Sequence, residues 1–192
     1  VDVTDRQAVD EAVARVVAST GGTLDAVVAN AGIRVAGAFE ETPVADLRQT
    51  FDVNLCGAMH VTRAALPALR ATKGSRVVVS SSVGGLSALP GLAAYCGSKW
   101  ALEGWAESLA HEMAPLGVSV AIVAPASVRT GLWDAGSVHG DPDGPYAAML
   151  QAPGEGDDRA WARALGPARG SATLARVVRG RRRAPPPPTP PP

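Results

Sequence analysis

The sequence predicts an α/β protein organised as a doubly wound parallel sheet. Three short apolar runs, AVVA at 26–29, RVVVSS at 76–81 and VSVAIVAP at 118–125, have the length and β-branched content of strands. They are apolar at successive positions, as expected for strands that are buried on both faces. Stretches with helical periodicity separate these runs, and this alternation places parallel strands between layers of helices.

The first helix is expected over residues 5–19. Its apolar side chains fall on one stripe, and Gly21-Gly22 supplies the stop signal that follows. The stripe consists of Ala8, Val9, Ala12, Val13, Val16 and Val17.

A longer helical tract is expected over residues 43–70, with Thr42 as its cap and Pro43 at its first helical position. Pro67 is expected to kink or end this tract, because proline removes a backbone donor. Two more helices are expected, one running from the region of Tyr95 to about residue 115 and one over 167–179.

Length and composition favour one domain, over residues 1–180, with a small molecule as its partner. A chain of 192 residues with 46% apolar content can bury a single core. Its 18 basic and 18 acidic residues cancel, which gives no basis for a nucleic-acid partner or a membrane surface. Cysteines and histidines lack metal-ligand spacing, so no metal site is expected, and two cysteines favour a reducing, cytoplasmic compartment. No apolar run reaches the ~18–20 residues that span a bilayer.

Tyr95 and Lys99 form the most informative pair of residues in the chain. They are four positions apart, so a helix places both on one face. A phenol with a pKa near 10 exchanges protons poorly at neutral pH, and a neighbouring ammonium favours its phenolate. Ser82 follows the strand at 76–81, at the carboxyl edge of the sheet where α/β proteins bind ligands. The three side chains together can supply an acid, its activator and a hydrogen-bond donor.

Two further signals accompany these residues. Asn30-Ala31-Gly32 directly follows the strand at 26–29, and Asn54 lies in the sequence VNLCG. With Ser82 and Tyr95-x-x-x-Lys99, they occur in the order and spacing of the short-chain dehydrogenase/reductase family. Over roughly residues 1–132 the chain resembles the single-domain, nicotinamide-dependent branch of that family, which has a Rossmann-like fold.

The resemblance implies a catalytic role for four residues. Tyr95 would be the general acid/base, and Ser82 would hydrogen-bond the substrate oxygen. Lys99 would hold the nicotinamide ribose and lower the pKa of Tyr95. Asn54 would anchor a water in a proton relay and locally disturb the helix that carries it. Ser80 and Ser81 are neighbours of Ser82 in the sequence, but the spacing of thirteen residues to Tyr95 favours Ser82.

The same resemblance implies NAD or NADP as the cofactor, without deciding between them. Asp2-Val3 matches a loop beside the adenine, and Gly32 would permit close approach of the backbone. Ala126 stands where relatives carry glycine, which removes a positive-φ option from that loop. The implied cofactor-binding set is Asp2, Val3, Asn30, Ala31, Gly32, Tyr95, Lys99, Pro125, Val128 and Thr130.

The chain begins at Val1, and no glycine-rich strand-to-helix turn precedes the first expected helix. Against the family pattern, we expect an N-terminal truncation of roughly 50–60 residues, about two βα units. The sheet would then be incomplete, the strand at 26–29 would expose a hydrogen-bonding edge, and the chain would be a poorly stable fragment.

Two later segments depart from regular patterns. Residues 134–158, rich in Gly, Asp and Pro, are interpreted as a mobile segment on the substrate side. Residues 181–192 form an Arg/Pro-rich tail. This tail is either a disordered end or a polyproline II ligand for an aromatic-lined groove, and its composition favours disorder.

The expected function is therefore hydride transfer that interconverts an alcohol and a ketone or aldehyde, on an apolar small molecule. By resemblance, the complete protein would be a homodimer or homotetramer. Two alternatives stay open: a catalytically inactive relative that serves as a binding or scaffold module, and an adaptor that acts through its proline tail.

Overall fold

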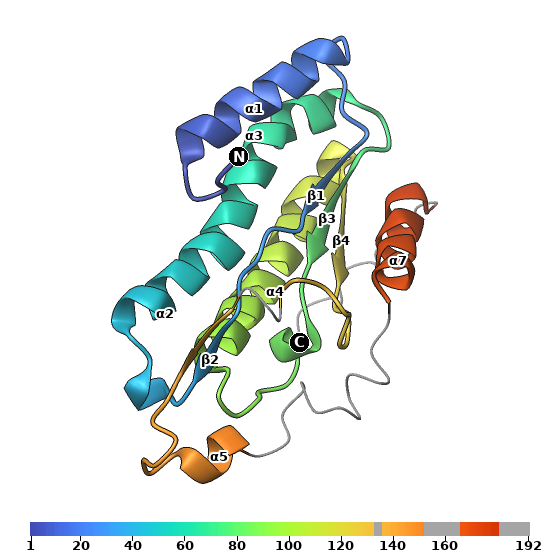
Figure 1. The fold of residues 1–192 in the computed structure, drawn as a ribbon. Helices are drawn as coiled ribbons and strands as arrows, with labels where there is room; N and C mark the ends of the chain where they lie inside the picture. Colours follow the sequence, from blue (N-terminus) through green and yellow to red (C-terminus); the bar gives the residue numbers. More distant parts are fainter. Residues whose placement is uncertain (133–135, 152–165, 181–192) are drawn as a thin grey trace, which may run out of the picture.

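The structure is a computed structural model that describes residues 1–132, 136–151 and 166–180. Strands and helices alternate along the chain (Figure 1). In order they are α1 (Arg6–Ser19), β1 (Ala26–Ala29), β2 (Val35–Gly37), η1 (Phe39–Glu41), α2 (Val44–Phe51), η2 (Asp52–Cys56), α3 (Gly57–Ala71), β3 (Arg76–Ser80), η3 (Val83–Gly85), α4 (Ala93–Met113), η4 (Ala114–Leu116), β4 (Ser119–Val123), β5 (Ser137–His139), α5 (Ala147–Gln151) and α7 (Pro167–Arg179).

The three predicted strands form one parallel sheet in the order β1-β3-β4. Val77, Val78 and Val79 of the central strand are completely buried, which explains their continuous apolar run. Among the described strands, β1 pairs with β3 alone, so β1 is an edge strand, as the sequence predicts. The predicted α/β fold with an incomplete parallel sheet is therefore confirmed.

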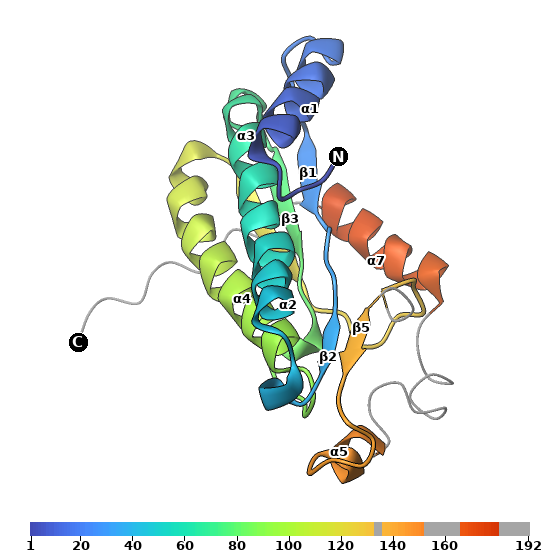
Figure 2. The same ribbon diagram turned by 60° about the vertical axis from the view of Figure 1, so that its left-hand side comes forward.

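Helices cover the two faces of this sheet unequally. α1, α3 and α4 lie on one face, whereas α7 lies on the other (Figures 1 and 2). The main core fills the first interface, where Leu69 of α3 and Leu102 of α4 are almost fully buried. On the opposite face, Val28 of β1 remains 39% exposed. Of the two covered faces that the sequence predicts, one is built as expected and one is partly open.

The helical tract after residue 43 is continuous from α2 through η2 into α3. η2 is a π-helical turn that contains Asn54, which confirms the predicted local disturbance of the helix. Pro67 lies inside α3 without ending it. The expected cap is wrong: the Thr42 hydroxyl donates to Ala38 O at 2.8 Å, across η1, and Pro43 is the residue that precedes the helix.

A second, two-stranded parallel sheet joins β2 to β5, and the sequence did not predict it. Each strand has three residues, too few for a period to be recognised. β5 and α5 lie within the segment 134–158, so part of that segment has regular structure. Residues 134–135 and 152–158 of the segment and the tail 181–192 lie outside the described residues.

Gly57 offers a test of the packing between α3 and the N-terminal segment. A Cβ at Gly57 would lie 2.5 Å from Val3 Cγ2, whereas a Cβ at Gly104 of α4 would meet nothing within 4 Å. Both glycine-to-alanine substitutions raise helix propensity by a similar amount. The difference in the free energy of unfolding between the two variants therefore isolates the clash. We expect urea denaturation to find Gly57→Ala less stable than Gly104→Ala by about 1–3 kcal/mol. Equal stabilities would contradict the close contact at Val3.

Candidate functional site

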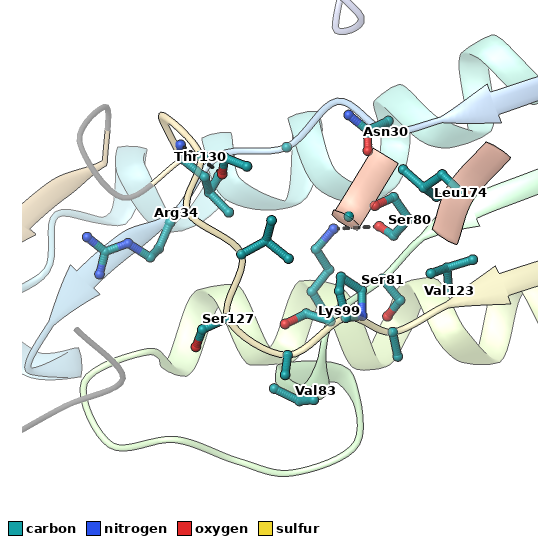
Figure 3. A pocket seen from close by; sticks show the side chains of 18 of the residues that line it. Asn30, Arg34, Ser80, Ser81, Val83, Lys99, Val123, Ser127, Thr130 and Leu174 are labelled. Carbon is teal, nitrogen blue, oxygen red and sulfur yellow. Dashed lines mark hydrogen bonds between the residues drawn. The ribbon is translucent and has the colours of Figure 1, made fainter. Parts of the chain in front are cut away.

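A cavity of about 600 Å³ lies at the carboxyl ends of β1, β3 and β4. This is the edge at which open α/β sheets bind ligands. Side chains from several loops and from α4 and α7 surround it (Figure 3). Most of the predicted site residues line it: Asn30, Gly32, Ser82, Tyr95, Lys99, Pro125, Val128 and Thr130.

Tyr95 and Lys99 lie one turn apart on α4, and both are buried, with 7% and 5% of their surface exposed. The Lys99 ammonium is 5.9 Å from the centre of the Tyr95 ring. It donates a hydrogen bond to the backbone oxygen of Ser80 at 2.9 Å, drawn as a dashed line in Figure 3. α4 therefore aims both side chains into one cavity, and the end of β3 holds the charged one in place.

The burial of Lys99 affects its proton affinity. Removal from water lowers the pKa of Lys99 to about 8, and the negative charge of Glu103 opposes this shift. With a pKa near 8, the side chain is still mostly charged at neutral pH. It can therefore stabilise a negative charge that develops on a neighbouring phenol.

Ser82 lies at the start of η3, in the loop between β3 and α4. Its Oγ accepts a hydrogen bond from the Gly84 backbone N–H at 3.1 Å, so the hydroxyl proton remains available for donation. Gly84 lies against the phenol, since a Cβ there would be 3.2 Å from Tyr95 Cε1. The absence of a side chain at Gly84 thus lets the serine loop pack closely on Tyr95.

Asn54 does not line the cavity but lies behind it, completely buried. Its amide accepts from Ile33 N at 2.8 Å and donates to Ile33 O at 3.0 Å and to Ser98 Oγ at 2.9 Å. Asn54 therefore joins η2, the loop after β1 and α4. A Cβ at Gly32 would lie 3.3 Å from Asn54 Oδ1, so a small residue at position 32 makes room for this amide.

Three predicted cofactor-binding residues lie elsewhere. Ala31 is exposed and does not line the cavity. Asp2 accepts two hydrogen bonds from Thr4, from its backbone N–H at 2.9 Å and its hydroxyl at 2.8 Å, which lower the pKa of the carboxyl. Val3 packs against Gly57, and its carbonyl oxygen lies 3.0 Å from His60 Nδ1. The structure does not bring these residues to the cavity, and their role in binding the cofactor stays a prediction.

The loop after β4 closes one side of the cavity. Pro125 O accepts a hydrogen bond from Val83 N at 3.1 Å, which ties this loop to η3. Val128 faces α7, since a Cβ at Gly170 would lie 3.1 Å from Val128 Cγ1. Among the described residues, no residue other than glycine has a positive φ, so Ala126 takes an ordinary backbone conformation here.

Sequence reasoning missed Arg34 and the residues of α7 that line the cavity. Arg34 is half-buried, and burial lowers the pKa of its guanidinium while the charge of Tyr95 opposes that shift. In Figure 3, Lys99 lies between Arg34 and Thr130 on one side and Asn30 on the other. The position of Arg34 directly after Asn30-Ala31-Gly32-Ile33 is the signal that could have identified it.

Comparison with known sequences assigns the family. The short chain dehydrogenase family profile matches residues 1–137. The chain therefore belongs to the short-chain dehydrogenase family. The uncharacterized oxidoreductase YusZ of Bacillus subtilis (strain 168) is 39% identical over 132 residues, 69% of this chain and 46% of that protein. Human 17-beta-hydroxysteroid dehydrogenase type 1 is 37% identical over 142 residues, 74% of this chain and 42% of that protein.

Solved structures agree with this assignment. A short-chain dehydrogenase from Streptomyces avermitilis superposes with a TM-score of 0.77 at 36% identity, covering 96% of this chain and 66% of that one. An NAD+-bound xylitol dehydrogenase gives a TM-score of 0.65 at 29% identity, covering 69% of this chain and 51% of that one. The chain spans about half the length of the curated relatives it matches, for example 46% and 47% of two of them.

Two features are absent from the part of the chain that the structure describes. None of its helices has the length and apolar character needed to cross a membrane. The same residues contain no cluster of three His, Cys, Asp or Glu side chains that could hold a metal ion.

The bonds of Asn54 predict a large effect on stability. Asn54→Ala leaves Ile33 N and Ile33 O without their partners, and each buried group left unsatisfied costs about 1–3 kcal/mol. We expect urea denaturation to show a loss of about 2–4 kcal/mol in the free energy of unfolding. Asn30→Ala is the matched control, because Asn30 is exposed and should change stability by less than about 0.5 kcal/mol. Equal losses in the two variants would contradict the bracing role of Asn54.

The pKa of Lys99 predicts a dependence of stability on pH. Between pH 8 and 10.5 the unfolded chain holds a proton on Lys99 that the folded chain has lost, so stability rises with pH. The full rise is about 3 kcal/mol. Lys99→Met should remove this rise from urea denaturation curves, whereas Lys73→Met, at an exposed lysine, should retain it. Parallel curves for the parent and Lys99→Met would refute the burial effect.

Proposed function

We propose that this chain carries the catalytic half of an NAD- or NADP-dependent oxidoreductase that interconverts an alcohol and a ketone or aldehyde. The observation that carries the proposal is the arrangement of Ser82, Tyr95 and Lys99 around one cavity at the carboxyl edge of the sheet. Family membership over residues 1–137 supports the same reaction class.

The cavity suits an anionic nicotinamide cofactor. Its described lining includes two cations, Arg34 and Lys99, and no carboxylate, and its volume of about 600 Å³ exceeds that of a small substrate alone. When bound, the cofactor supplies or accepts the hydride. We assign its binding to Lys99 and to a set of residues around it: Asn30, Gly32, Pro125, Val128 and Thr130 at the cavity, with Asp2, Val3 and Ala31 beyond it.

Tyr95 is proposed as the general acid/base. Its Oη would give a proton to a carbonyl oxygen in reduction and take one from the alcohol in oxidation. Lys99 supports this role because its ammonium is 5.9 Å from the ring centre and favours the phenolate. The buried position of both side chains strengthens the interaction, since water screens it less.

Ser82 and Asn54 are proposed to assist Tyr95 in different ways. The Ser82 hydroxyl, which already accepts from Gly84 N, would donate to the reacting oxygen and stabilise its developing charge. Asn54 would hold the loop that carries Gly32 against α4, and it would anchor the relay water that the family resemblance implies.

The substrate is proposed to be an apolar alcohol or carbonyl compound. Ile33, Val83 and Leu132 are among the apolar side chains that line the cavity. Relatives are named for a hydroxysteroid, a ketodihydrosphingosine and a hydroxycyclohexanecarboxylate. We also propose that the protein self-associates through the outer face of α4, where Trp100 is 55% exposed. Sedimentation velocity would test this self-association.

The two tyrosines of the chain offer a direct test of the reaction. Tyr95→Phe should lower kcat at least 100-fold with NADH or NADPH and an apolar ketone, because general acid/base catalysis contributes about 10²–10⁴-fold. Cofactor affinity should change little. Tyr146→Phe is the control, since Tyr146 does not line the cavity and its hydroxyl donates to Glu40 at 2.6 Å.

Turnover is to be measured in the 192-residue chain and in the product of its whole open reading frame. Retention of full turnover by Tyr95→Phe would refute the assignment of the acid/base. Absence of turnover in both parent proteins, with intact folding, would favour the binding-module alternative.

A further inference from the structure

Glu103 is a half-buried acidic residue that the proposed reaction does not use. It lies on α4 one turn after Lys99, so the two side chains share a face of the helix. We propose that the Glu103 carboxylate is the counter-charge that keeps Lys99 positively charged at neutral pH, and that Glu103 thereby positions charge for Tyr95.

Packing confines Glu103 beneath the loop between β3 and α4. A Cβ at Gly85 of η3 would lie 3.2 Å from Glu103 Cγ and 3.1 Å from Lys99 O. Gly85 therefore approaches α4 at the turn that joins the two residues. This loop thus covers part of the Glu103 side chain, which is half-buried.

The carboxylate has a buried oxygen without a hydrogen bond. Among the described residues, neither Glu103 Oε1 nor Ser81 Oγ, both buried, has a hydrogen-bond partner. Ser81 Oγ is also close to Gly85, since a Cβ at that glycine would lie 2.9 Å from it. A carboxylate with one buried oxygen that lacks a hydrogen bond is stabilised by a positive charge nearby. Lys99, one turn away, supplies it.

Among the described residues around Lys99, Glu103 is the one whose negative charge acts on it. Tyr95 lies one turn before it on α4, and Arg34, a second cation, lines the same cavity. The atom that Lys99 contacts on β3 is the uncharged backbone oxygen of Ser80, and η2 presents the uncharged Asn54. The interaction between Lys99 and Glu103 opposes the effect of burial on the pKa of Lys99, which stays at about 8.

Loss of this counter-charge would lower the pKa of Lys99 further. Lys99 would then be partly uncharged at pH 7, and Tyr95 would lose the cation that favours its phenolate. The catalytic consequence rests on the proposed function. The electrostatic interaction between Lys99 and Glu103 does not, because it is a property of the folded chain.

The composition of the chain permits a direct test, because Lys73 and Lys99 are its two lysines. In lysine-labelled protein, the ¹³Cε signals report each titration separately, Lys73→Arg assigns them, and the exposed Lys73 is an internal reference. We expect the Lys99 midpoint near 8 in the parent. In Glu103→Gln it should fall by about one pH unit, a tenfold loss of proton affinity.

Two further variants provide the controls. Glu107→Gln removes an exposed carboxylate from the same helix and should leave the Lys99 midpoint unchanged. Glu103→Asp retains the charge and should give a midpoint between those of the parent and Glu103→Gln. An unchanged Lys99 midpoint in folded Glu103→Gln would overturn the proposal.

If Glu103→Gln unfolds, its two lysine signals merge, and the test is then made on the parent chain. In glutamate-labelled protein, the Glu103 carboxyl carbon should shift in a step at the Lys99 midpoint. Absence of that step would overturn the proposal. If the parent shows both the Lys99 titration and the Glu103 step but no turnover, the proposed function is refuted. The interaction between Lys99 and Glu103 would then still stand.

Discussion

The site depends on one buried contact, the hydrogen bond from the Lys99 ammonium to the backbone oxygen of Ser80. It joins α4 to the carboxyl end of the central strand, at the edge where the cavity opens. A buried ammonium is costly, so the fold must supply compensation. The carbonyl of Ser80, the nearby ring of Tyr95 and the charge of Glu103 together provide it.

Glycines and an amide complete the arrangement around this contact. Gly32 makes room for Asn54 and Lys99, Gly84 lets the serine loop approach Tyr95, and Gly85 brings the same loop onto α4. Asn54 then joins the loop after β1 to α4 through Ile33 and Ser98. These contacts hold the acid/base candidate and its cation in a fixed relation, as general acid/base chemistry requires.

The sequence predicted the elements whose patterns are local and long. Continuous runs of valine identified β1 and β3, and a full apolar stripe identified α1. The spacing of Tyr95 and Lys99 identified one face of α4, because helical periodicity fixes it. The sequence could not reveal β2 and β5, since their pairing joins residues about one hundred positions apart. The roles of Arg34 and of α7 in the cavity were missed for the same reason: tertiary packing alone brings them there.

We expect this cavity to bind a nicotinamide cofactor through Lys99. A fluorescence titration with NADH and with NADPH, on the product of the whole open reading frame and on its Lys99→Met variant, would measure this binding. The parent should bind at least one cofactor saturably, and the variant should bind it at least about tenfold more weakly, equivalent to roughly 1.4 kcal/mol. Equal affinity in parent and variant, or no binding by the folded parent, would contradict it.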